Sequence, residues 1–98
     1  MSGTAKERNP WLVAVGVYLY LKDVILRCDI IDSRTQEFEI DVPEIDWATI
    51  RTDYQNGACC LADAQAFVTA WHEVLHAMKI AKRDGTYCSP AWIAGKGR

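Results

Sequence analysis

The sequence has neither a long hydrophobic run nor an excess of charge of either sign. Its longest stretch without a charged residue spans 9–21, which is shorter than the roughly 20 apolar residues of a membrane-spanning helix. Eleven Lys and Arg residues stand against thirteen Asp and Glu residues, so the net charge is −2. A chain without a basic surplus has no general attraction for nucleic acid. We therefore expect neither a membrane nor a nucleic acid as a partner.

Recognisable targeting signals and internal repeats are lacking as well. Lys6, Glu7 and Arg8 mix charges near the start, and no small-residue cleavage site follows the apolar stretch. The sequence shows no repeated unit of fixed length. We expect a cytoplasmic protein.

Cysteines are few and unfavourably spaced for a disulfide framework. Two of the four are adjacent, which makes pairing awkward, and a cytoplasm would keep thiols reduced. Buried, inert thiols are the default expectation for small apolar side chains of this kind. The four cysteines are Cys28, Cys59, Cys60 and Cys88.

The composition is that of one globular domain. Half of the 98 residues are hydrophobic and 24% are charged, which is enough apolar material for a single core. The first ten residues are small, polar and mixed in charge, and the last thirteen contain Pro90 and two glycines. We expect a flexible leader over 1–10, a single α+β domain over 11–85 and an irregular C-terminal tail over 86–98.

Alternating apolar side chains predict three strands in the first half of the domain. Valine and leucine recur at every second position over 12–21, and the next apolar segment, 24–31, follows a turn at Lys22-Asp23. A third alternating segment, 37–42, ends before Pro43. The expected sheet is a three-stranded antiparallel meander.

The apolar spacing changes to three and four residues after Pro43, which predicts helices. A short helix is expected from Glu44 to the Asn56-Gly57 stop, and a long one between a cap at Asp63 and the Asp84-Gly85 end. The long helix is expected to turn one apolar stripe toward the core, namely Phe67, Trp71, Val74, Leu75 and Met78. The predicted class is α+β, with one short and one long helix after the sheet.

Both histidines of the chain fall within the string His72-Glu73-Val74-Leu75-His76. Roughly one chain in a thousand of this composition contains such an H-E-x-x-H string by chance. Residues four apart lie one turn apart on a helix, so two imidazoles can reach one Zn²⁺. The intervening glutamate can take a proton from zinc-bound water. The string predicts a zinc site with His72 and His76 as ligands and Glu73 as the general base.

Two other interpretations of these residues remain open. The histidines can be solvated or groove-lining side chains on the flank of the helix. They can also join Cys60 and Cys88 in a closed, four-ligand structural zinc site.

Around the motif the sequence resembles the HExxH metallopeptidases, or zincins, and among them very small metallopeptidase-like proteins of phages and prophages. The neighbouring uncharged residues fit that pattern, and 28–42 is weakly similar to the sheet edge ahead of the active helix. The residues that fit are Thr69, Ala70, Val74, Leu75, Ala77 and Met78. The resemblance implies zinc-dependent hydrolysis of a peptide bond. It also implies a third ligand downstream of His76, for which Asp84 is the candidate and Cys88 the alternative.

A non-enzymatic function is the alternative hypothesis. No Glu or His follows His76, and the second helix usual after the motif is missing. Small size, near-neutral charge and four tryptophans suit an interaction protein, such as a phage-type inhibitor or assembly module. Trp92, in the tail, is expected either to anchor a partner or to fold over the domain.

Overall fold

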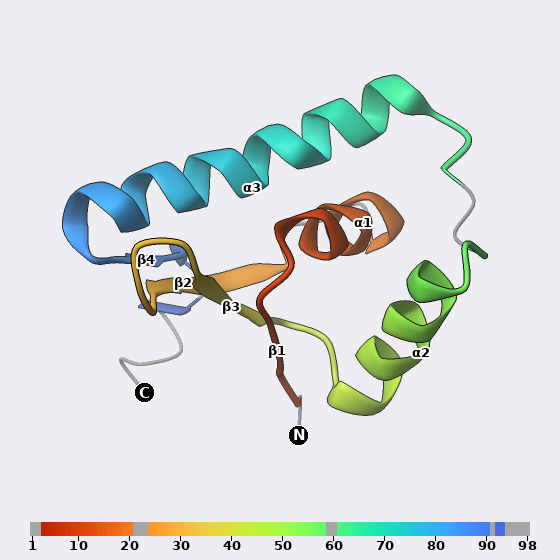
Figure 1. The fold of residues 1–98 in the computed structure, drawn as a ribbon, viewed down its shortest axis with the longest axis horizontal. Helices are drawn as coiled ribbons and strands as arrows, with labels where there is room; N and C mark the ends of the chain where they lie inside the picture. Colours follow the sequence, from red (N-terminus) through yellow and green to blue (C-terminus); the bar gives the residue numbers. More distant parts are fainter. Residues whose placement is uncertain (1–2, 21–23, 59–60, 91, 94–98) are drawn as a thin grey trace.

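The protein is an α+β domain built from one antiparallel sheet and three helices in the described residues (Figure 1). The structure is a computed structural model that describes residues 3–20, 24–58, 61–90 and 92–93. Its elements are β1 (Ala5–Glu7), α1 (Pro10–Tyr20), β2 (Ile25–Ile30), β3 (Gln36–Ile40), α2 (Glu44–Gln55), α3 (Ala64–Asp84) and β4 (Thr86–Cys88). Within the described residues no helix combines the length and apolar character needed to cross a bilayer.

The sheet has four strands in the order β1-β3-β2-β4, and all neighbours are antiparallel. Cys28 of β2 lies opposite both Phe38 of β3 and Tyr87 of β4, so these side chains share one face. Helices α1 and α3 lie beside each other over that face (Figure 1). Helix α2 lies at the far end of α1, away from β4 (Figure 1).

The predicted strand over 12–21 is wrong, because this segment forms α1. All six residues from Leu12 to Val17 are buried, so the helix is surrounded by protein and has no polar face to reveal its period. Valine occurs at every second position in this segment, and that spacing is also typical of a strand. The start of the helix does carry a sequence signal: the side chain of Asn9 accepts a hydrogen bond from the backbone N–H of Trp11 (3.0 Å), and Pro10 is the first helical residue.

The two outer strands come from segments expected to be a flexible leader and an irregular tail. Residues 5–7 form β1, which pairs with β3, and Ala5 is 2% exposed. Residues 86–88 form β4, which pairs with β2. Three-residue strands carry too little local pattern to be found in a sequence. The sheet therefore has four strands rather than three, and the described residues hold three helices rather than two.

The remaining elements agree with the predictions. β2, β3, α2 and α3 fall within one or two residues of the expected bounds, and Asp63 caps α3 as predicted. The expected turn at Lys22-Asp23 lies outside the described residues.

The core is held at one end by Trp47 of α2. Its ring is fully buried against α1, where a Cβ added to Gly16 would lie 2.5 Å from the nearest ring atom. Its indole N–H donates to Glu7 Oε1 over 2.9 Å, and the guanidinium of Arg51 pairs with the same oxygen at 3.2 Å. The indole and its carboxylate partner thereby tie α2 to β1.

Candidate functional site

Helix α3 positions every residue of the H-E-x-x-H string. Asp63 Oδ1 accepts the backbone N–H of Ala66 (3.0 Å) at the start of the helix, and Gly85 ends it in the left-handed conformation with φ 89°. The buried side of α3 consists of small or branched residues, which lets the helix lie close to the sheet: Ala70, Val74, Ala77 and Ala81.

The predicted apolar stripe is rotated relative to the core. Of its five members Val74 is fully buried, whereas Leu75 is 41% exposed and Phe67, Trp71 and Met78 are partly buried. Alanines occupy the positions that face the sheet, so the larger apolar residues lie on the flank and outside of the helix. The predicted stripe was chosen from the large apolar side chains, and it therefore missed this rotation.

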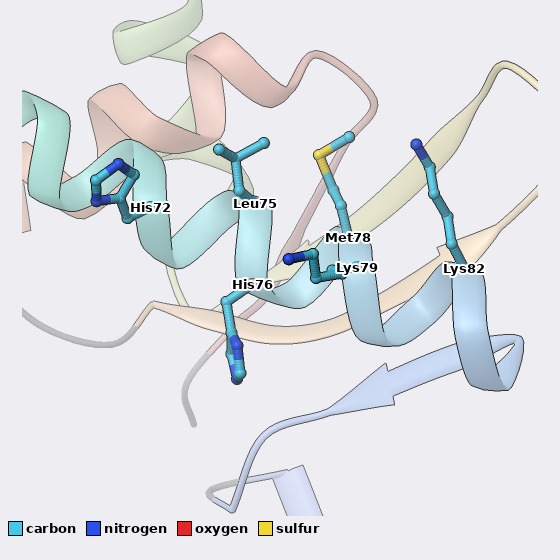
Figure 2. A pocket seen from close by; sticks show the side chains of 6 residues that line it. All are labelled: His72, Leu75, His76, Met78, Lys79 and Lys82. Carbon is cyan, nitrogen blue, oxygen red and sulfur yellow. The ribbon is translucent and has the colours of Figure 1, made fainter.

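The three motif residues His72, Glu73 and His76 are exposed on α3 and line one open groove of about 430 Å³. Tyr87 of β4 forms part of its wall, and the ring of His76 meets that of Tyr87 edge-on at 6.2 Å between centroids. Figure 2 shows the imidazoles of His72 and His76 directed to different sides. His72, Glu73 and His76 thus face solvent, whereas Val74 of the same string lies in the core.

Asp84 is not brought to the histidines. It is the last residue of α3, eight residues beyond His76, which separates the two by about 12 Å along the helix axis. Its carboxylate bonds the neighbouring Arg83 guanidinium at 3.0 Å, and this bond lowers the pKa of Asp84 below its ordinary value. The structure therefore places Asp84 away from the predicted metal site.

The cysteines are not brought to the histidines either. Cys28 is fully buried, and this desolvation raises the pKa of its thiol to about 12. Cys88 alternates with Tyr87 along β4 and so belongs to the sheet face opposite α3. Cys60, the other thiol of the proposed four-ligand site, and Cys59 lie outside the described residues. No three His, Cys, Asp or Glu side chains of the described residues group to hold a metal ion.

Within the described residues a catalytic zinc site is incomplete. Such an ion generally needs three protein ligands and one open position, and α3 supplies two imidazoles. The described part of the chain adds no third ligand. We therefore derive no reaction step through a metal.

A second groove, of about 550 Å³, runs along the C-terminal half of α3 (Figure 2). Leu75 and Met78 provide its apolar surface, and Lys79 and Lys82 provide ammonium groups. Neither ammonium takes part in a salt bridge among the described residues. We call this feature the cationic groove, and its lining residues are His72, Leu75, His76, Met78, Lys79 and Lys82.

An exposed aromatic pair lies beside this groove on the helical layer. Trp11 of α1 stacks on Trp71 of α3 with ring centroids 4.0 Å apart and planes inclined by 8°. Trp11 remains 50% exposed, and Val68, on the same helix as Trp71, is 49% exposed. Because these residues are far apart in the sequence, only the packing of α1 on α3 reveals the pair.

The opposite face of the sheet carries a polar cluster around β2. Arg27 pairs with Asp29 at 2.9 Å, and the hydroxyl of Thr86 donates to Asp29 over 2.7 Å. Although partial burial opposes them, these hydrogen bonds lower the pKa of Asp29. The guanidinium of Arg27 also lies 5.6 Å from the ring centroid of Trp92. Trp92 therefore folds over the domain, which was one of its two expected fates.

Comparison of this chain with protein-family models, curated proteins and solved structures finds no match.

Proposed function

We propose that the protein is a small, non-enzymatic interaction module that binds a protein partner through the outer face of α3. This face is defined by Trp11, Val68, Trp71, Leu75 and Met78. The observation that carries the proposal is the Trp11–Trp71 stack, in which Trp11 is half exposed and Trp71 partly buried, continued along α3 by the exposed Leu75. Contact with a partner would remove the exposed part of each of these side chains from water.

The physical basis is the gain from burying apolar surface. Removing apolar area from water is worth roughly 25 cal/mol per Å², and tryptophan is enriched among the residues that dominate binding energy. The stack of Trp11 on Trp71 already fixes both rings, so little side-chain entropy remains to be lost on binding. Neighbouring Lys79 and Lys82 add charges that can orient a partner.

Charge introduced into the outer face tests this function. We expect Leu75→Asp to weaken the affinity for the purified protein partner by at least about tenfold, because an aspartate would be desolvated in the contact. Leu19→Asp is the matched control, since Leu19 is 47% exposed on α1 and lies outside the outer face. Calorimetry on both variants provides the measurement. Equal affinities of Leu75→Asp and the unmodified protein would refute the proposal.

A zinc-dependent peptidase remains a second candidate because His72, Glu73 and His76 line the same open groove on an unbroken helix. This proposal needs a third ligand in addition to the described residues. It predicts about one zinc per chain, lost in His72→Ala and retained in Lys79→Ala, as measured by elemental analysis of protein purified without chelators. It also predicts that Glu73→Gln keeps the metal but loses hydrolysis of peptides. Equal zinc content in His72→Ala and the parent chain would exclude it.

A further inference from the structure

The residues that line the cationic groove indicate what kind of surface would fit it. Its surface is the apolar pair Leu75 and Met78, with the ammonium groups of Lys79 and Lys82 beside it. Figure 2 shows Leu75, Met78 and Lys82 projecting from the same side of α3. A protruding apolar side chain flanked by carboxylates would match this groove in both polarity and charge.

The chain itself carries such a feature at the start of α2. Ile45 is 79% exposed, more than any other large apolar side chain of the described residues. Glu44 and Asp46 flank it in the first helical turn. Glu44 bonds Arg51 at 3.3 Å, yet its side chain remains 58% exposed. We call Glu44, Ile45 and Asp46 the acidic knob.

The knob cannot enter the groove of its own molecule. Helix α3 runs along the top of the domain in Figure 1, whereas α2 begins at the bottom of it. A second copy can present its knob without any change in the fold. We propose, on the basis of the interaction function above, that the partner is a second copy of this chain, whose Ile45 docks between Leu75 and Met78 of the first copy.

The proposed contact is head-to-tail, because knob and groove lie on opposite sides of the domain and two copies cannot dock both pairs at once. Each copy that donates its knob leaves its own groove open, so such contacts produce rings or open chains rather than a closed pair. The contact is also small, with one apolar side chain and two or three opposite charges. We therefore expect weak, salt-sensitive association, detectable between about 10 μM and about 1 mM.

Sedimentation velocity over this concentration range tests the inference on the full chain. The unmodified protein is expected to show a weight-average mass that rises with concentration and falls on adding salt. Ile45→Asp and Leu75→Asp should each remain monomeric. Ile31→Asp is the matched control, since Ile31 is also an exposed isoleucine, at 46%, and it should associate like the parent chain.

Mixing the two variants gives the sharpest result. Ile45→Asp keeps an intact groove and Leu75→Asp keeps an intact knob, so the equimolar mixture forms one functional contact and stops at a dimer. A two-fold symmetric contact through either patch would not be restored by mixing. A mixture that stays monomeric therefore overturns the proposed docking, as does association of Ile45→Asp alone that matches the parent chain. Circular dichroism of each variant verifies that the variants are folded.

Failure of this inference can be told apart from failure of the interaction function. If the parent chain stays monomeric at every concentration while Leu75→Asp still loses a different protein partner, the second copy is the wrong occupant and the interaction function stands. If Leu75→Asp affects neither self-association nor the binding of any other protein, both proposals fail.

Discussion

At the scale of single residues, the fold depends on a few contacts with no room for change. Gly16 and Trp47 are the clearest pair, because a methyl group on the glycine would lie 2.5 Å from the indole. Cys28 is another such residue, since it lies fully buried between sheet and helices. Both residues yield predictions about stability.

We expect Gly16→Ala to destabilise the protein. Alanine favours a helix over glycine by about 1 kcal/mol, whereas overpacking a core costs about 1–3 kcal/mol. Trp47 is fully buried and bonded to Glu7, so it cannot move aside cheaply, and the steric cost should prevail. Urea unfolding measures the net change. A gain of about 1 kcal/mol would show that the glycine does not face the indole.

The buried thiol of Cys28 predicts a loss of stability at high pH. Its pKa is raised from 9.0 to about 12 by burial, so the unfolded chain releases this proton first. The contribution of Cys28 is complete below pH 9 and decreases by at most about 1.4 kcal/mol per pH unit as the pH rises toward 12. The stability difference between the parent chain and Cys28→Ala should shrink over this range. A constant difference in urea unfolding across these pH values would contradict the account.

At the scale of elements, α3 combines a buried face with the outer face that we propose as the binding surface. Alanines on its inner side allow close packing on the sheet, whereas Trp71 is partly buried and Leu75 is exposed. The ends of the helix are fixed by Asp63 and by Gly85 in the left-handed conformation. The outer face is therefore presented on a rigid support.

The cap of α3 gives a prediction with an internal control. Asp63→Ala removes the acceptor of the Ala66 N–H and should cost about 1 kcal/mol. Asp63→Asn keeps an acceptor oxygen at the same place and should retain most of that stability. Thermal or urea unfolding compares the two variants. An equal loss in both would mean that charge, rather than the cap bond, stabilises this end.

Elements in which apolar and polar residues alternate with a clear period could be predicted from the sequence. β3 and α2 each expose one face and bury another, so their spacing predicted them. α1 is buried along most of its length, so the spacing of its apolar residues did not distinguish a helix from a strand. Helical period also placed His72, Glu73 and His76 together on α3. The Trp11–Trp71 stack depends on tertiary packing and was beyond any local pattern.

At the scale of the whole molecule, the sheet is completed by segments from both ends of the chain. β1 and β4 are the two outer strands, so residues 5–7 and 86–88 bracket the central pair β2 and β3. The two helices α1 and α3 cover one sheet face (Figure 1), and they carry the exposed apolar residues Trp11, Val68 and Leu75. The architecture thus places the sheet on one side and a helical layer with exposed apolar side chains on the other.

Site-specific photo-crosslinking tests the central claim most directly. A photoreactive residue at position 75 should give discrete crosslinks to a protein, either a second copy of this chain or a different partner. The same residue at position 31, which is similarly exposed, should give none. Discrete crosslinks from position 31 and none from position 75 would show that proteins bind elsewhere and that the outer face of α3 is not the binding surface.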